Sequence, residues 1–232
     1  MIRFFTLSLI INFWAVNAQP LDYSLWTEIL QKYVSDNGAV NYKYLKNNKS
    51  AFESYLKLLS ASAPNEDCSV DIKKAYWINV YNAFTVQLII ENYPLKSIKD
   101  LRRPWDQSFI EIGGEKITLN TIEHKILRPM GDPRIHFAIV CASQSCPKLL
   151  NHAYEPSTLE DQLKNVTTVF INDPLKNNIN KSSVKISKIF KWFKTDFPKR
   201  EAFIAFLNSY SNIKILAQAD VDYLNYNWGL NE

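Results

Sequence analysis

The alternation of hydrophobic and polar residues divides the chain into helical stretches with a few strand-like stretches between them. Apolar residues recur every three or four positions in 22–34 and 48–62, so each segment is predicted to be an amphipathic helix. Residues 72–93 are apolar almost all round, which predicts a helix through the middle of the domain that ends before Pro94. Helical spacing also predicts shorter helices over 119–128, 158–173, 188–197 and 200–210.

Strand signals are fewer. Residues 108–119 alternate around Gly113-Gly114, a pair that tolerates the positive φ of a tight hairpin turn. Two further strands are predicted over 182–187 and 220–231. The segment "RIHFAIVCA", 134–142, is apolar on both faces and is therefore predicted to be a covered central strand. The mixture predicts an α+β fold with a small, mostly antiparallel sheet covered by helices.

The N-terminus predicts export. "MIRFFTLSLIINFWAVNAQP" has a basic start at Arg3, an apolar run from Phe4 to Val16, and small residues before Gln19. The run is shorter than the roughly 20 residues of a spanning helix, which favours a signal peptide over 1–18 rather than an uncleaved anchor. We expect a periplasmic or secreted protein with no stable membrane span after cleavage. The remaining 19–232 suit one domain, with a helical part at 21–62 and a core at 70–232.

Composition excludes few functions. Hydrophobic residues at 47% and charged residues at 22% are ordinary for a globular protein with a substantial core. The formal charge of +4 is spread among acidic residues and is too weak a field to predict a nucleic-acid partner. Three cysteines allow at most one intrachain bridge, so one thiol at least needs another explanation.

Two of those thiols lie close together in "VCASQSCPKL". Pro147 is placed like the first residue of a helix, which would make Cys146 its N-cap and stabilise a thiolate there. The neighbouring backbone N–H groups of Gln144 and Ser145 would supply an oxyanion hole. Three roles stay open for the pair: a reactive Cys146, a Cys141–Cys146 disulfide, or simple packing. Within a strand, His136 and Cys141 would face opposite sides and would not be partners.

A nucleophilic cysteine needs a base, and the best candidate is His124. Asn120, His124 and Arg128 fall on one polar face of the predicted helix 119–128. Glu123 lies nearer the apolar side; it either orients the histidine with a raised pKa or forms a structural ion pair with Arg128 or Arg134.

Three more polar residues stand in apolar surroundings. Asn79 and Asn82 lie three apart on the central helix, where they either clamp the backbone of a neighbouring loop or line a pocket and orient a histidine. His136 is expected to be a buried, hydrogen-bonded ring. Together with the cysteines these residues fit no recognised zinc spacing, and we expect neither a metal nor another cofactor.

Several motifs resemble the domain of unknown function 547: "AYWINVYNAFTVQLIIENYP", "ITLNTIEHKILRP", "DPRIHFAIVCASQSCPKL", "ISKIFKWFKTDF" and the C-terminal "YLNYNWGLN". The resemblance extends over about 45–230 and includes every candidate residue above. It implies exported bacterial relatives, and plant relatives fused to a leucine-zipper region, but no agreed activity. Lys148 departs from the pattern, since many relatives carry a second proline there.

These observations lead to two hypotheses. The first is a Cys-dependent hydrolase or acyl transferase acting on peptide or amide bonds of the cell envelope, with a rearranged papain- or transglutaminase-like core. Its catalytic residues would be Cys146, His124, Glu123 and Asn82, and its binding residues Asn79, His136, Cys141 and Arg128. The second is a non-catalytic binding or scaffolding domain in which Cys141 and Cys146 are structural or disulfide-bonded.

Overall fold

The computed structural model describes residues 21–199 and 201–232, and the predicted signal peptide lies outside these residues. The long helix α4 (Val70–Asn92) is buried on all sides along most of its length, as its all-round apolar pattern predicts. Its N-terminus is capped by Ser69, whose side chain accepts a hydrogen bond from Ile72 N at 3.2 Å. This helix is the axis on which the other elements pack.

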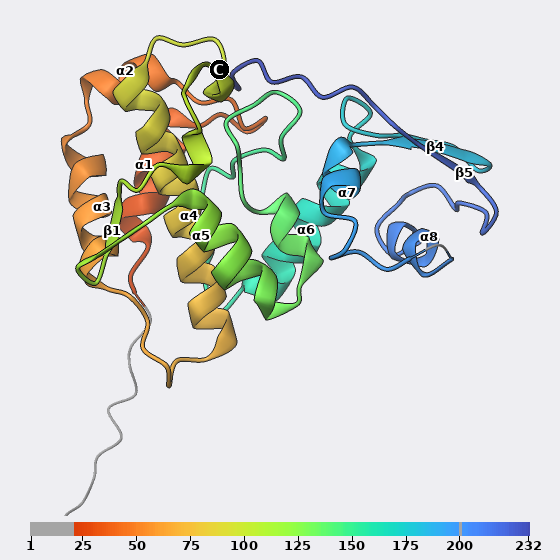
Figure 1. Ribbon diagram of the computed structural model, residues 1–232, viewed down its shortest axis with the longest axis horizontal. Coiled ribbons are helices and arrows are strands. Elements are labelled where there is room, and N and C mark those ends of the chain that lie inside the picture. The colour runs from red at the N-terminus through yellow and green to blue at the C-terminus, as the bar shows by residue number, and fades with distance from the viewer. Residues whose placement is uncertain (1–20, 200) are drawn as a thin grey trace, which may run out of the picture.

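Three N-terminal helices cover one side of α4 (Figure 1): α1 (Ser24–Tyr33), α2 (Tyr42–Asn47) and α3 (Ser50–Ala61). Their shared interior is aromatic. Trp26 of α1 stacks on Tyr55 of α3 with ring centroids 5.0 Å apart. The Tyr76 hydroxyl of α4 donates to the Leu59 carbonyl oxygen of α3 at 2.6 Å, which fixes how the two helices meet.

Two small sheets confirm the α+β class. The predicted hairpin is present as β1 (Ile110–Ile112) and β2 (Glu115–Ile117), paired antiparallel, with φ of 59° at Gly113 and 85° at Gly114. The second sheet has the order β3 (Asn178–Ile179), β4 (Ser183–Ile186), β5 (Asp220–Tyr223); β3–β4 is antiparallel and β4–β5 parallel. No cysteine or histidine lies in any of these five strands, so a papain-like core is not supported.

The remaining helices follow the sequence pattern with shorter bounds. They are α6 (Leu159–Asn172), α7 (Lys188–Trp192) and α8 (Glu201–Asn208). Single 3₁₀ turns occupy Ile98–Asp100 and Pro104–Asp106. In Figure 1, α6 lies between the first helices and the part formed by α7, α8 and the β3–β5 sheet. After β5 the chain runs back toward the N-terminal helices, where the C-terminus lies.

The predicted helix 119–128 is helical but not uniform. It begins as α5 (Leu119–Thr121), widens into a π-helix over Ile122–Leu127, and closes as a 3₁₀ turn over Arg128–Met130. Pro129 therefore lies inside the last turn, and Gly131, with φ of 75°, ends it. A π-turn inside a helix rotates the following side chains out of α-register, an arrangement often found at functional sites.

The predicted central strand over 134–142 is wrong. A 3₁₀ helix covers Pro133–Phe137, and the chain from Ala138 to Thr158 has no regular secondary structure beyond one isolated bridge, Ser143↔Leu230. The segment is apolar because it is buried on several sides, and a buried strand shows the same pattern. The expectation that His136 and Cys141 face opposite sides of a strand falls with it.

Two buried amides of α4 replace the missing strand partners. The Asn82 amide donates to the Ala138 carbonyl at 2.9 Å and accepts from Val140 N at 2.9 Å. Asn79 holds Tyr154 in the same way, at 2.8 and 3.0 Å. Both side chains thus clamp the backbone of the irregular segment, the structural of the two roles considered for them.

We predict that Asn82→Ala lowers the free energy of unfolding by roughly 2–4 kcal/mol, because it leaves one buried N–H and one buried C=O without a partner. Asn92→Ala is the matched control, since Asn92 lies exposed at the end of the same helix and bonds only to Leu88 of its own helix. Urea denaturation followed by circular dichroism measures both. Equal losses in the two variants would contradict the clamp.

Candidate functional site

A cavity of about 230 Å³ opens beside the clamped segment. Its walls come from α4, the π-helix, the irregular segment, α7 and the chain that follows β5. It gathers most of the chemically capable side chains that the sequence singled out: Glu123, His124, His136, Cys141 and Cys146. The two clamping asparagines do not line it. The fold therefore brings Cys141 and Cys146 together with His124 and His136. It does so without the strand and the helix N-terminus that were predicted to carry the cysteines.

Cys141 is the more exposed thiol of the pair and has the lower pKa. Its Sγ lies 3.1 Å from Ser143 Oγ and 3.2 Å from Tyr226 Oη, and it is partly exposed. A hydrogen bond from the Cys146 thiol, followed by those from Ser143 and Tyr226, lowers the pKa of Cys141 to about 7 against the opposing effect of burial. The next residue, Ala142, has φ of 55°, so the chain turns sharply just after this thiol.

Cys146 is placed differently from the prediction. No helix follows it, so it is not an N-cap, and its Sγ accepts a hydrogen bond from Cys141 N at 2.9 Å. The side chain is 4% exposed, and burial raises its pKa well above the ordinary value. The N–H groups proposed for an oxyanion hole are used elsewhere: Gln144 N bonds to Gly229 O at 2.7 Å and Ser145 N to Asn227 O at 3.1 Å. All three cysteines are free thiols in the structure.

Glu123 is buried in the cavity wall by the π-helix. Its Oε2 accepts a hydrogen bond from the Tyr81 hydroxyl at 3.2 Å. Burial raises the pKa of the Glu123 carboxyl to about 7, and negative charge on Cys141 adds to the rise. The predicted ion pair with Arg128 or Arg134 is wrong. Arg128 binds Asp196, and Arg134 binds the carboxylates of Asp132 and Glu160.

His136 is held between two carboxyl groups. Its Nε2 lies 2.8 Å from Asp196 Oδ2, and its Nδ1 lies 3.9 Å from Glu123 Oε1 with no hydrogen-bond partner among the described residues. Phe193 stacks on the ring at 3.9 Å. Burial lowers the pKa of His136 to about 4, so the ring is neutral near pH 7. It is the buried, hydrogen-bonded histidine that the sequence predicted, but with one nitrogen aimed at Glu123.

His124 lies at the cavity wall and is engaged by Arg128, whose Nη1 is 2.9 Å from His124 Nδ1. Burial and the neighbouring guanidinium lower its pKa. Arg128 in turn binds Asp196 with two hydrogen bonds of 2.6 Å, and these lower the pKa of that carboxyl. Asn120, on the same predicted face, bonds instead to Asp106. His124 and Arg128 thus brace Asp196, which holds His136.

Four further residues belong to the site and were not among the sequence candidates: Asp196, Tyr226, Trp192 and Trp228. All four lie inside the two C-terminal motifs quoted above, so a signal existed. None of them stands out by residue type, however, because both acidic and aromatic side chains are abundant throughout this chain. Tyr226 and Trp228 reach the cavity because the C-terminal segment is hydrogen-bonded to the 143–145 turn.

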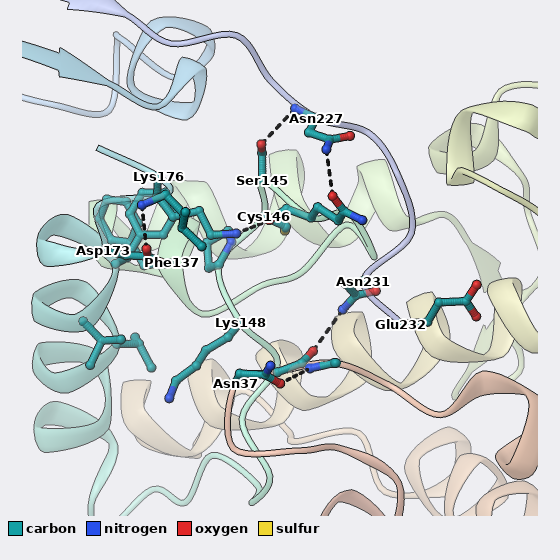
Figure 2. A pocket seen from close by; sticks show the side chains of 18 residues that line it. Asn37, Phe137, Ser145, Cys146, Lys148, Asp173, Lys176, Asn227, Asn231 and Glu232 are labelled. Atoms are coloured by element: carbon teal, nitrogen blue, oxygen red, sulfur yellow. Dashed lines mark hydrogen bonds between the residues drawn. The ribbon is translucent and has the colours of Figure 1, made fainter. Parts of the chain in front are cut away.

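That turn also borders a second, larger hollow of about 670 Å³ (Figure 2). Figure 2 shows Asn227 tied to Ser145; its N–H donates to Ser145 Oγ at 2.8 Å, and its side chain donates to Gln144 Oε1 at 2.7 Å. Lys148 and Lys176 lie on its walls, and Cys146 separates it from the smaller cavity. The histidines and Glu123 line the smaller cavity and not the larger hollow, so the smaller cavity is the candidate site.

Residues 66–171 match the family model described as "Protein of unknown function, DUF547". This part of the chain is similar to the family that the motifs indicate, and the match includes α4, the π-helix, both site cysteines and most of α6. The segments that carry Asp196, Tyr226 and Trp228 lie beyond the matched residues. No curated protein and no solved structure matches the chain.

Two further findings concern the described residues only. No group of three or more His, Cys, Asp and Glu side chains within 21–199 and 201–232 is placed to hold a metal ion. Nor does any helix in this part of the chain combine the length and apolar character needed to cross a membrane.

We predict that iodoacetamide alkylates Cys141 with a half-maximal rate near pH 7, because its thiolate forms there, while buried Cys146 does not react in the folded protein. Peptide mass spectrometry in a Cys68→Ser background measures the two rates separately. Cys146→Ala removes the strongest hydrogen bond to the thiolate and should move the midpoint to higher pH. An unchanged midpoint would show that Cys146 does not stabilise it.

Proposed function

We propose that the chain is a Cys-dependent acyl-transfer enzyme, a hydrolase or an acyl transferase, with Cys141 as its nucleophile. The observation that carries the proposal is the cavity itself, in which a partly exposed thiol of low pKa and a buried carboxyl of raised pKa lie together. Groups with shifted pKa values gather at catalytic sites because the chemistry needs them to exchange protons near neutral pH.

The thiol and the carboxyl have similar pKa values. Both the Cys141 thiol and the Glu123 carboxyl have a pKa of about 7, and charge on either disfavours charge on the other. Moving a proton from one group to the other therefore costs little. In the reactive form Cys141 is a thiolate and Glu123 is protonated, which supplies a nucleophile and a general acid within one cavity.

The reaction follows from that starting state. The thiolate attacks the acyl carbon of R–CO–X, the C–X bond breaks, and the Glu123 proton leaves with X as HX, giving a Cys141 thioester. Water or another acceptor then attacks the thioester while the Glu123 carboxylate takes its proton. The C–S bond breaks, and the thiolate and the protonated carboxyl are restored.

His136 acts as a positioning residue. Its Nδ1 faces Glu123 at 3.9 Å, and its Nε2 is fixed by Asp196. A neutral imidazole there keeps the carboxyl in place without adding a positive charge that would pull its pKa down. Tyr226, whose hydroxyl contacts Sγ, is the polar group available to the acyl oxygen once the sulfur is esterified.

This proposal moves the nucleophile from Cys146 to Cys141 and the proton-transfer role from His124 to Glu123. An envelope substrate, export and a mature chain beginning near Gln19 remain proposals that rest on the N-terminal sequence alone. The alternative, a non-catalytic binding domain, would keep both thiols as packing groups.

We predict that Glu123→Gln lowers the turnover of activated esters, such as p-nitrophenyl acetate, by about 10²–10⁴-fold, since it removes the proton donor and acceptor. The same variant should still be alkylated at Cys141, with a midpoint below pH 7, because the repelling carboxylate is gone. Glu115→Gln, an exposed change in the β2 strand, is the control for charge removal. Ester turnover that survives Cys141→Ser would refute the acyl-transfer function.

A further inference from the structure

Four aromatic rings at one end of the cavity, which we call its aromatic mouth, indicate what kind of ligand it binds. Trp192 is 45% exposed and stacks on Trp228 with centroids 5.6 Å apart, and Tyr226 lies within 4.7 Å of both rings. Trp105 packs against Trp228 from the other side at 5.8 Å. Trp192 is exposed and the other three rings are half-buried, and aromatic surface left accessible at a cavity is a binding feature, because packing alone would bury it.

Size limits the occupant. The cavity of about 230 Å³ has room for about eight groups of the volume that one water molecule takes in the liquid, ~30 Å³ each. Ligand pockets for larger molecules occupy about 300–1,000 Å³. A peptide or a sugar chain therefore does not fit inside, whereas one short side chain or acyl group does.

Charge limits it further. Both histidines on the cavity walls have lowered pKa values and are neutral near pH 7, so an anionic group would find no cation among them. A cationic group is opposed as well, because Lys99 Nζ already lies 4.9 Å from the centre of the Trp228 ring. Ile139, Ile189 and Phe193 add apolar surface to the walls beside the aromatic rings. The cavity is built for a neutral, apolar group.

The thiol lies within reach of that group. Tyr226 belongs to the aromatic mouth and also contacts Cys141 Sγ at 3.2 Å, so a chain resting on the rings carries its first carbon to the sulfur. We infer that the cavity binds the acyl chain of an ester, thioester or amide, a neutral unbranched chain of up to about eight carbons, and presents its carbonyl carbon to Cys141. This inference rests on the proposed function and names its substrate class.

Alkyl chloromethyl ketones, R–CO–CH₂Cl, test the inference without requiring turnover. The Cys141 thiolate displaces chloride and becomes a thioether, so the rate reports how well R is bound beside the sulfur. Each buried methylene contributes enough free energy for about a fourfold increase in rate. In the Cys68→Ser protein the rate should rise from R = methyl to R = hexyl and fall again for R = dodecyl.

Two variants test where the alkyl chain of the ketone binds. Trp192→Ala should reduce the hexyl-to-methyl rate ratio by about tenfold or more, because it removes one wall of the mouth. Leu175→Ala is the matched control: Leu175 is 84% exposed and lines only the larger hollow, so the ratio should not change. A ratio that falls in Leu175→Ala and not in Trp192→Ala would overturn the inference and place the chain in the larger hollow.

The remaining outcomes separate the two proposals. If Cys141 is labelled faster than Cys146 but at the same rate for every chain, the acyl inference fails and the acyl-transfer function stands. If Cys141 is labelled no faster than Cys146, the proposed function itself fails. A trimethylammonium-bearing ketone that reacts faster than its tert-butyl analogue would show a cation-binding mouth and would likewise overturn the inference.

Discussion

The site depends on how a protein can bury a stretch of chain that is neither helix nor strand. Every buried N–H and C=O needs a partner, and an irregular segment cannot supply them from within. Here Asn82 and Asn79 reach from α4 and take the place that a neighbouring strand would have. Because α4 is deeply buried, the segment that is hydrogen-bonded to it is held in a fixed position. The position of Cys141, immediately after the clamped Ala138–Val140, follows from that anchoring.

A second constraint is electrostatic. Burying Glu123 and Cys141 together makes two negative charges unfavourable, while Asp196, paired with Arg128, stays ionised at the edge of the site. Environment thus shifts the pKa values of two carboxyl groups in opposite directions, upward for Glu123 and downward for Asp196. His136 lies between them and stays neutral. The opposite pKa shifts of Glu123 and Asp196 distinguish this cavity from a simple cluster of polar residues.

The regular elements could be predicted because their burial has a period. The all-round apolar pattern of α4 and the one-sided pattern of α6 describe the surfaces they bury. The segment 134–142 has no such period, because a covered strand and a clamped irregular chain both have a continuous apolar sequence. The two asparagines were visible as anomalies, but their partners lie more than 55 residues away and could not be read from spacing. The placement of Cys146 as a helix N-cap was wrong for a related reason, since Pro147 resembled a helix start and the turn is instead held by residues 227–229. Asp196 and Tyr226 depend on contacts across 60 and 85 residues, which sequence pattern alone does not encode.

The hydrogen bonds between the C-terminal segment and the 143–145 turn have a consequence for how the protein matures. Ribosomes make Cys141 long before Tyr226, and in the intervening time the thiol lacks the hydroxyl that contacts it in the finished structure. Trp228 likewise joins the mouth of the cavity only when β5 has paired with β4 and the chain has turned back. The surroundings of Cys141 are therefore complete only once the C-terminal segment is in place. A chain that is still being synthesised carries this sulfur without the Tyr226 hydroxyl and the Trp228 ring.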